Sequence, residues 1–385
     1  MAGILIFAER LLFWVISLSV CYSFVFAFFS LFGRKKKYPV AVKQYRFLVL
    51  IPAYKEDKVI FSAVESILDQ DYPAEKIDIV VISDGMADET NQALSEMPVL
   101  LLTINPVASS KANALNCAME HLERKDYNVV VILDADNTVE SEFISEINDA
   151  FYSGASALQT HRTAKNLDND IAILDAVSEE INNSIFRKGH TCLGFSSALV
   201  GSGMAFEFSW FVNNITKLNS AGEDKELEIL LLKERIYIDY LDYVIVYDEK
   251  TRKERAFYNQ RRRWLAAQFE SMFAGLRYIP QAILRVNLDY IDKIFQWMLL
   301  PKIILLGLIV ILVILTSIVS IELSFRWWLL LFVLLTSFVF AIPGFLITKR
   351  NIRVINKLPV LFLLMFINLL RLKGANKKFI HTEKG

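Results

Sequence analysis

Apolar segments without charge alternate with a long polar region along this chain. Residues 11–32, 303–321 and 327–347 contain no charged side chain, and each is long enough to cross a bilayer as a helix. A further apolar stretch, 358–370, is too short to span comfortably, which favours an interfacial or re-entrant helix. The pattern predicts these parts in order: a membrane anchor at 1–37, a globular domain at 38–267, amphipathic interface helices at 268–296, two membrane helices at 297–348, and an interfacial helix with a basic tail at 349–385.

The distribution of basic residues orients these segments. The basic run 34–37 directly follows the first apolar segment, whereas only Glu9 and Arg10 precede it, and no small-residue cleavage site suggests a signal peptide. Because positive charges stay on the cytoplasmic side, we expect the N-terminus outside and the globular domain in the cytoplasm. The last two membrane helices are expected to go out and return through a short turn at 322–326. The sequence therefore predicts a multi-pass protein of the cell (inner) membrane.

Short apolar runs alternate with helical spacing inside the globular region. Helical spacing of apolar residues occupies 59–68 and 111–122, and a longer helical stretch is expected at about 169–187. Strands alternating with helices predict an α/β fold with a mostly parallel sheet that is covered on both faces. The expected strands are 46–51, 77–82, 100–104, 129–133 and 157–160.

Carboxylates follow several of these strands. Glu56, Asp84 and Asp134 come after the first, second and fourth runs, and the carboxyl ends of parallel strands share the edge where ligands bind. Asp134 and Asp136 are two residues apart, so side-chain alternation along a strand would point both the same way. Such hard oxygen ligands suit Mg²⁺ or Mn²⁺. A solvated Asp-x-Asp turn after a core strand remains the alternative for this motif alone.

Two later polar motifs also have alternative interpretations. Glu223 and Asp224 open an amphipathic segment, where acids at a helix N-terminus are ordinary partners of the helix dipole. The run 258–264 contains three consecutive arginines and a tryptophan, which suit phosphate binding and the stacking of a sugar ring. A basic cluster near anionic lipid is the alternative for this run. Apolar residues at helical spacing within 269–276 predict an amphipathic helix in the plane of the membrane interface.

Composition supports a globular domain tethered to a bilayer. Hydrophobic residues make up 54% of the chain, yet 22% of the residues are charged, so the chain is not wholly embedded. The net charge of +0 provides no global field that would favour a nucleic acid partner. Cys21, Cys117 and Cys192 are scattered without metal-type spacing and fit a reducing compartment.

Taken together, the motifs resemble one family. The chain is similar to the membrane-bound family 2 glycosyltransferases, the inverting group that includes cellulose, chitin, hyaluronan and poly-N-acetylglucosamine synthases. The resemblance implies a nucleotide-diphospho-sugar transferase domain of the GT-A type, Rossmann-like in its N-terminal half, and a UDP-sugar donor. The motifs that carry it are Ile51-Pro52-Ala53-Tyr54-Lys55-Glu56, Ser83-Asp84-Gly85, Lys111-Ala112-Asn113-Ala114-Leu115-Asn116, Asp134-Ala135-Asp136, Gly201-Ser202-Gly203, Glu223-Asp224 and Gln260-Arg261-Arg262-Arg263-Trp264.

The resemblance assigns roles to the residues at the donor side. Asp84 would accept hydrogen bonds from the base or ribose, and Lys111 would lie near the nucleotide and offset its charge. Asp136, with Asp134 beside it, would bind the divalent metal ion that bridges the diphosphate. The uridine pocket would be lined by Pro52, Tyr54 and Glu56.

The acceptor side follows from the last two motifs. Asp224 would be the general base that takes a proton from the acceptor hydroxyl. Gln260 and Arg263 would contact the diphosphate, and Trp264 would form the floor under the acceptor sugar. The sequence departs from the family at Lys55, where Asn is usual, and at Gly222, where several polymer synthases have Thr.

These roles predict an inverting β-glycosyltransferase that extends a glycan at the cytoplasmic face of the membrane. Three expected spans are few for an export channel in one subunit, which implies a homo-oligomer, an export partner or a short product. Transfer of a single sugar to a lipid-linked acceptor is the enzymatic alternative, because it needs no channel. A non-catalytic membrane scaffold is the alternative from another class, although it would be expected to have lost Asp136, Asp224 or Arg263.

Overall fold

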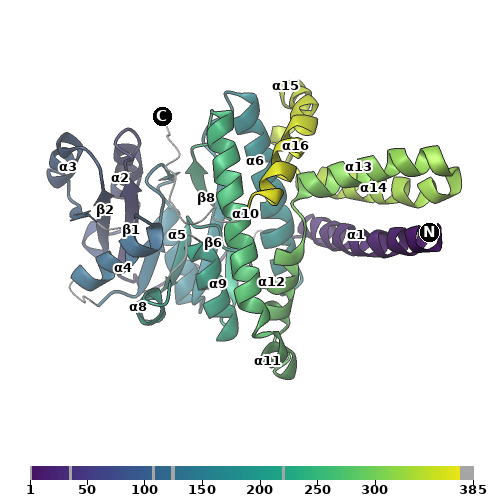
Figure 1. Ribbon diagram of the computed structural model, residues 1–385. Coiled ribbons are helices and arrows are strands. Elements are labelled where there is room, and N and C mark those ends of the chain that lie inside the picture. The colour runs from purple at the N-terminus through teal and green to yellow at the C-terminus, as the bar shows by residue number, and fades with distance from the viewer. Residues whose placement is uncertain (1, 34–36, 106–108, 123–125, 219–221, 373–385) are drawn as a thin grey trace.

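The computed structural model has a globular part and a narrow helical arm (Figure 1). It describes residues 2–33, 37–105, 109–122, 126–218 and 222–372. The basic residues at 34–36 and in the tail from 373 onward therefore lie outside the described residues. The arm consists of α1 (Ala2–Ser30), α13 (Lys302–Val319) and α14 (Ile321–Ala341), which run side by side away from the globular part.

A single sheet forms the centre of the globular part, and its described strands have the order β3-β2-β1-β4-β7-β6-β8-β5. The first four strands in this order are parallel. They are β3 (Leu100–Ile104), β2 (Ile77–Asp84), β1 (Phe47–Tyr54) and β4 (Val129–Ile132), followed by β7 (Met204–Glu207), β6 (Ala157–Ala164), β8 (Ile238–Asp248) and β5 (Thr138–Val139).

The expectation of a mostly parallel sheet is correct only for its N-terminal half. β7 is antiparallel to both β4 and β6, and β5 is antiparallel to β8, while β6 and β8 are parallel. Met204 at the start of β7 pairs with Ile132 at the end of β4. Because β7 begins at the edge where β4 ends, it has to run back along β4.

Helices cover both faces of the sheet. In β1, Leu48 and Leu50 face one core, and Val49 and Ile51 face the other, as side-chain alternation requires. Burial on both faces explains why the strands are continuously apolar. The first face is covered by α4 (Lys111–His121), α8 (Phe208–Ile215) and α9 (Glu223–Lys233), and the second by α2 (Ile60–Leu68), α3 (Asp88–Ser95) and α5 (Phe143–Tyr152).

A long helical segment joins the sheet to the arm. Asn169 caps α6 (Asp170–Asn183), which continues as a π-helical turn, η2 (Ser184–Gly189), and the short α7 (His190–Cys192). Gly189 lies against α1 so closely that a Cβ atom there would be 2.1 Å from the carbonyl oxygen of Phe26. This close approach places η2 at the junction between the globular part and α1.

Helix α10 (Glu254–Leu276) runs without a break across the expected domain boundary at residue 267. The expected interfacial helix at 269–276 is therefore the second half of α10. Its Met272 packs in the core with Tyr290 and Ile294 of α12 (Leu288–Met298), whereas Phe273 is 65% exposed. The short α11 (Ile279–Leu284) connects the two helices.

The turn expected at 322–326 is wrong, because these residues form the first turns of α14. Ser320 caps this helix by accepting a hydrogen bond from the backbone N–H of Leu323. Within α14, Arg326 pairs with Glu9 of α1, and Trp327 Nε1 donates to the same carboxylate at 2.9 Å.

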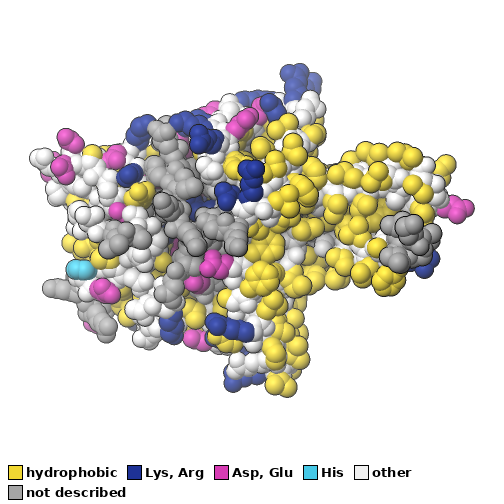
Figure 2. All heavy atoms as spheres, in the orientation of Figure 1, with side chains coloured by type: hydrophobic (Ala, Val, Ile, Leu, Met, Phe, Trp, Pro, Cys, Tyr) yellow, Lys and Arg dark blue, Asp and Glu magenta, His cyan; other side chains and the backbone are white. Residues whose placement is uncertain are grey.

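Four described helices are long and apolar enough to cross a membrane: Phe7–Ser30, Lys302–Val319, Ile321–Ala341 and Lys349–Leu370. The last is longer than the expected 358–370 because α15 (Lys349–Arg353) and η4 (Val354–Lys357) lead directly into α16 (Leu358–Leu370). Figure 1 shows α16 running across the direction of the arm. Hydrophobic side chains cover the arm and continue over its base, as Figure 2 shows. An interfacial position of α16 stays a prediction.

Candidate active site

The Asp-x-Asp motif lies in a turn and not in a strand. β4 ends at Ile132, and the backbone N–H of Asn137 donates to the carbonyl oxygen of Asp134 at 3.0 Å. Strand alternation therefore does not aim the two acids, contrary to the expectation from their spacing. Both nevertheless line the same cavity. Asp136 is 2% exposed, whereas 31% of the Asp134 side chain is accessible, so the two acids have different surroundings.

The bend at 201–203 supports this turn. The hydroxyl of Ser202 accepts from the backbone N–H of Asp134 at 2.9 Å and also bonds to the amide oxygen of Asn137. Gly203 has a φ of +65°, and a Cβ there would lie 2.2 Å from Thr160 Oγ1. Only glycine fits this position, because both the backbone conformation and the close approach exclude a side chain.

Lys111 links the turn to two other elements. It begins α4, where Ser110 is the capping residue, and its ammonium group pairs with Asp134 and donates to the carbonyl oxygen of Gly201 at 2.6 Å. Glu223 Oε1 lies 3.7 Å from the same nitrogen. Burial disfavours the charge of Lys111, but Asp134 and Glu223 outweigh it and raise the pKa of Lys111.

The two acids of the Glu223-Asp224 motif open α9. Burial raises the pKa of Glu223 to about 7, Lys111 opposes this shift, and the neighbouring charge of Asp224 adds to it. Asp224 accepts from the backbone N–H of Lys225 at 2.9 Å and lies 3.3 Å from the ammonium group of Lys225. The carboxylate of Asp224 is thus held in place while it lines the cavity.

Helix α10 presents its polar motif to the same cavity. Arg263 lies where the charges of Glu223 and Asp134 reach it, although burial lowers its pKa. The buried Gln260 Oε1 has no hydrogen-bond partner within the described parts of the chain. Trp264 is 36% exposed. Gln260, Arg263 and Trp264 all line the cavity on this side.

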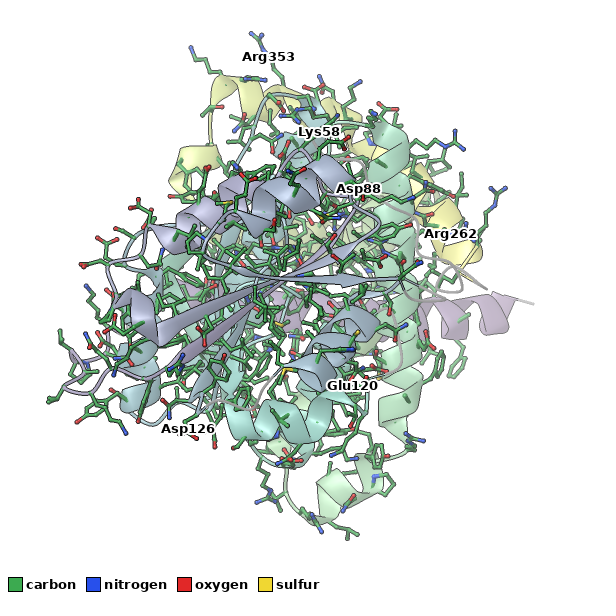
Figure 3. The ribbon with its side chains drawn as sticks, turned by 90° about the vertical axis from the view of Figure 1, so that its left-hand side faces the viewer. Lys58, Asp88, Glu120, Asp126, Arg262 and Arg353 are labelled. Atoms are coloured by element: carbon green, nitrogen blue, oxygen red, sulfur yellow. The ribbon has the colours of Figure 1, made fainter. Side chains whose placement is uncertain are left out.

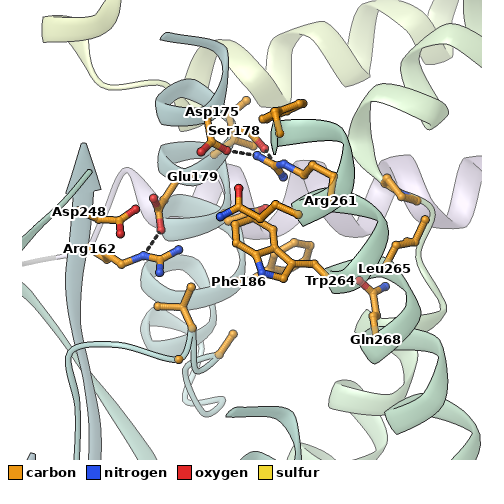
Figure 4. Close-up of a pocket in the computed structure, with 18 of the residues that line it drawn as sticks. Arg162, Asp175, Ser178, Glu179, Phe186, Asp248, Arg261, Trp264, Leu265 and Gln268 are labelled. Carbon is orange, nitrogen blue, oxygen red and sulfur yellow. Dashed lines mark hydrogen bonds and ion pairs between the residues drawn. The ribbon is translucent and has the colours of Figure 1, made fainter. Parts of the chain in front are cut away.

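The two other arginines of the motif have different positions. Arg261 pairs with Asp175 of α6, and its guanidinium carbon lies 5.1 Å from the centre of the Trp264 ring (Figure 4). This pairing fixes the tryptophan against α6. Arg262 points outward (Figure 3) and donates to the carbonyl oxygen of Arg371 at 2.8 Å. The three consecutive arginines thus point in different directions from one helix.

The ends of β1 and β2 form the far wall of the cavity, with Pro52, Tyr54, Glu56 and Asp84 among its lining residues. Lys55 has a φ of +56°, and its backbone N–H donates to the carbonyl oxygen of Asp84 at 3.1 Å. Left-handed backbone favours Asn over other side chains, which explains the residue usual at this position. The Lys55 ammonium group lies 5.3 Å from the centre of the Tyr54 ring.

One cavity of about 1000 Å³ brings all these groups together. Every residue that the sequence assigned to the site lines it: Pro52, Tyr54, Glu56, Asp84, Lys111, Asp134, Asp136, Asp224, Gln260, Arg263 and Trp264. Their individual roles stay predictions. The cavity also extends between α6, α13, α14 and α16, where apolar side chains line it.

The sequence did not identify a buried charge cluster beside the Asp-x-Asp turn. Arg162 Nε donates to Glu179 at 2.6 Å (Figure 4). Lys250 pairs with Glu179 and, at 2.7 Å, with Asp248. Asp248 also accepts from the Asn137 amide at 3.1 Å. The members of this cluster come from β6, α6 and the chain at or just after the end of β8, so no regular spacing in the sequence connects them. The only signal was the polar run within β6, which is unusual for a buried strand.

Two carboxylates fit a divalent metal ion only as part of a larger set of ligands. Among the described residues, no group of three or more His, Cys, Asp or Glu side chains is arranged to hold a metal. Asp134 and Asp136 supply hard oxygen atoms on the cavity wall, as Mg²⁺ and Mn²⁺ prefer. These metals commonly take their remaining ligands from substrate phosphates and water, so the residues present fit such an ion.

The fold is that of the GT-A nucleotide-sugar transferases. A mannosyltransferase from Pyrobaculum calidifontis superimposes with a TM-score of 0.51 and 16% sequence identity, covering 84% of this chain and 97% of that one. Residues 45–267 match the model of the family described as glycosyltransferase like family 2. That match covers more than half of the chain, which therefore belongs to this family.

Curated relatives support the same assignment. The chain is 23% identical over 255 residues to a probable glycosyltransferase of Bacillus subtilis (strain 168), covering 60% of this chain and 57% of that protein. It is 23% identical over 237 residues to a beta-monoglucosyldiacylglycerol synthase of Trichormus variabilis, covering 58% of this chain and 48% of that protein. The chain spans about half the length of the curated relatives it matches.

Proposed function

We propose that this protein is an inverting β-glycosyltransferase that moves a sugar from a UDP-sugar to an acceptor at the cytoplasmic face of the membrane. The observation that carries the proposal is the single cavity in which carboxylates from β2, the Asp-x-Asp turn and α9 meet the cations of α4 and α10. Carboxylates suit the metal ion, the sugar hydroxyls and the base, and the cations suit a diphosphate. A nucleotide sugar presents both kinds of group.

The donor occupies the end of the cavity formed by β1, β2 and the Asp-x-Asp turn. Pro52, Tyr54 and Glu56 line the uridine pocket, and Asp84 accepts hydrogen bonds from the base or ribose. Lys111 and Arg263 would contact the diphosphate. Both are cations that interact with the charges of Asp134 and Glu223, which places them beside the proposed metal site. Gln260 also lines this side, where its side-chain N–H groups would donate to the diphosphate.

The transfer is one displacement at the anomeric carbon. Asp224 removes the proton of the acceptor hydroxyl, whose oxygen forms the new bond as the bond to the diphosphate breaks. The electron pair of that bond leaves with the nucleoside diphosphate, and the charges of Lys111 and Arg263 favour this product. Attack from the side opposite the leaving group inverts the configuration. Trp264 supports the acceptor sugar from below.

Asp136 and Asp134 would hold Mg²⁺ or Mn²⁺ at the diphosphate. The ion would supply positive charge that makes the nucleoside diphosphate a better leaving group. The Pyrobaculum mannosyltransferase structure is described as a complex with GDP-Man and Mn²⁺. That likeness concerns the fold, so the metal assignment for this chain rests on its own two acids.

Membrane attachment follows from the apolar arm. Four described helices qualify as spans, and hydrophobic side chains cover both the arm and its base (Figure 2). The division into anchor, globular domain, interface helices, membrane pair and basic tail is retained as part of the proposal. With the basic run at 34–37 on the inner side, the cavity faces the cytoplasm, where nucleotide sugars are made.

Release of nucleoside diphosphate by the full chain in detergent tests the proposal. UDP-glucose, UDP-galactose, UDP-N-acetylglucosamine and GDP-mannose are compared with Mg²⁺, Mn²⁺ or EDTA. A metal-dependent release from a UDP-sugar is expected, and Asp136→Asn and Asp224→Asn should each lower it at least about 100-fold at unchanged thermal stability. Asp88→Asn, at an exposed site on α3 (Figure 3), is the matched control. Near-normal turnover in either site variant would show that its assigned role is wrong.

A further inference from the structure

Two cations that have no carboxylate partner among the described residues lie where the cavity changes from polar to apolar. Arg187 lies on the π-helical turn η2, and Lys302 is the first residue of α13. Both line the cavity. In the part of the chain that the structure describes, neither forms an ion pair with an acid, in contrast to Arg162, Lys250 and Arg261.

Arg187 is the more deeply buried of the two, at 4% exposed. Its guanidinium group donates to the carbonyl oxygen of Ala198 at 3.1 Å and to Asn183 Oδ1 at 2.5 Å. Both partners are neutral. The charges of Glu179 and Glu228 reach Arg187, yet burial still lowers its pKa. A buried charge is unfavourable unless an opposite charge compensates it, and no described acid forms an ion pair with Arg187, so this position is suited to a further anion.

Lys302 lies close to the same turn. Its ammonium group bonds to Asn182 Oδ1 and stands 4.1 Å from the centre of the Phe186 ring. Asn182, Asn183, Phe186 and Arg187 all belong to the segment from α6 to η2. Burial is the main effect that disfavours the charge of Lys302, and the charges of Arg187 and Arg261 add to it. The nearby Asp175 and Glu179 are already paired, with Arg261 and with Arg162 and Lys250. An excess of positive charge remains.

Apolar walls begin directly beyond this pair. Ile303 and Leu306 follow Lys302 on α13, and Phe338 and Val339 face the cavity from α14. These helices are candidate membrane spans. On the other side, Arg261 lies between Lys302 and Trp264: its charge acts on Lys302, and its guanidinium group contacts the Trp264 ring, where the acceptor sugar is expected. The cavity therefore passes from the transfer site through a cationic zone to an apolar zone.

We propose that the acceptor is a phosphate-bearing lipid whose phosphate binds Arg187 and Lys302 while its apolar chain lies between α13, α14 and α16. This inference rests on the proposed glycosyltransferase function and names its acceptor class. The phosphate compensates the two cations, the hydroxyl to be glycosylated reaches Trp264 and Asp224, and the chain leaves along the spans into the bilayer. A soluble glycan leaves both the cationic and the apolar zones without a complementary group.

Equilibrium binding to the full chain in maltoside detergent tests the proposed phosphate-binding site at Arg187 and Lys302 without any transfer reaction. The probes are farnesyl phosphate, farnesol and inorganic phosphate, read by tryptophan fluorescence, because Trp264 and Trp297 line the cavity. Farnesyl phosphate should bind at least about 10-fold more tightly than either of the others, since it alone carries both the anion and the chain. Equal affinity for farnesol would refute the proposed phosphate-binding site. Equal affinity for inorganic phosphate would refute the proposed binding of the apolar chain.

Variants of the two cations sharpen this test. Lys302→Gln and Arg187→Gln should each reduce the preference for farnesyl phosphate over farnesol about 10-fold, and Arg187→Lys should restore part of it. Lys349→Gln is the matched control, because Lys349 is also the first residue of an apolar helical segment but is exposed and does not line the cavity. An unchanged preference in both glutamine variants overturns the proposal, even if Arg187→Gln alone fails to fold.

A sugar-transfer experiment distinguishes failure of this inference from failure of the function on which it rests. With a radiolabelled UDP-sugar and membrane lipid extract, label in the organic phase in a product that an anion-exchange column retains supports the acceptor class, and label in an uncharged lipid overturns it. Label in soluble oligosaccharides, such as added cellotetraose, overturns that class and leaves the glycosyltransferase intact. Absence of nucleotide release with every donor overturns the proposed function, while the binding experiment still decides whether Arg187 and Lys302 form a phosphate-binding site.

Discussion

Replacing Glu223 with glutamine tests the electrostatics at the centre of the cavity. Glu223 is 8% exposed, and its carboxylate lies 3.7 Å from the Lys111 ammonium group. Burial raises its pKa from 4.5 to about 7, Lys111 opposes the shift, and Asp224 adds to it. At neutral pH the folded protein therefore carries an acid that ionises less readily than it does in the unfolded chain.

The sign of the pH dependence follows from this shift. Below pH 4.5 the side chain is protonated in both states, whereas between 4.5 and about 7 only the folded state keeps the proton. Stability contributed by this group is thus full in acid and is lost as the pH rises through the folded pKa. At about 1.4 kcal/mol per pH unit, the loss amounts to about 3 kcal/mol above pH 7.

Glutamine cannot ionise, so Glu223→Gln should remove that loss. We expect a gain of up to about 3 kcal/mol at pH 8, which corresponds to a rise in Tm of about 6 to 12 °C, and a gain of at most about 1 kcal/mol at pH 5, because the unfolded acid only begins to ionise near pH 4.5. The assay is thermal unfolding of the full chain in detergent with EDTA. Glu254→Gln, an exposed acid in the first turn of α10, is the control. The same Tm change at both pH values, or a lower Tm at pH 8, would refute the reasoning.

Two further predictions concern backbone conformation. Gly203→Ala should destabilise the protein by more than about 2 kcal/mol and lower nucleotide release, because the new methyl group meets Thr160 Oγ1; Gly154→Ala, where φ is +103° but nothing lies within 4 Å, should cost about 1 kcal/mol and leave release unchanged. Equal effects of the two alanines on release would contradict the role assigned to the bend. Lys55→Asn should raise stability by up to about 1 kcal/mol in thermal unfolding, because Asn tolerates its left-handed backbone; a lower Tm would mean that the contact with Tyr54 matters more than the backbone strain.

The predicted GT-A fold class is confirmed, and so is the family. The apolar runs locate the strands of the N-terminal half closely, since fully buried strands carry a continuous apolar signal: the expected 100–104 coincides with β3, and the expected 77–82 lies within β2. Motif order carried the family resemblance because each motif is a local stretch of chain. Most residues assigned to the site lie at or after strand ends or at helix starts that face this cavity, whereas Gln260, Arg263 and Trp264 reach it from the middle of α10.

Local patterns failed where two distant segments decide the geometry. The direction of β7 depends on its pairing with β4, and the contacts of Arg326 and Trp327 with Glu9 hold α14 beside α1. The Asp-x-Asp turn is held by Ser202, which lies 68 residues from Asp134. None of these contacts leaves a periodic trace in the sequence, because each joins single side chains far apart along the chain.

Local patterns along the chain specify the apolar segments, the alternation of strands and helices, and the identity of the residues that carry the chemistry. Which charges neutralise each other depends on contacts between remote segments: Lys111 pairs with Asp134, Arg261 pairs with Asp175, and neither Arg187 nor Lys302 forms an ion pair with an acid among the described residues. Composition fixes the number of charges, whereas the energy of a buried charge depends on what lies within a few ångströms of it. That distance is set by the folding of remote segments against one another.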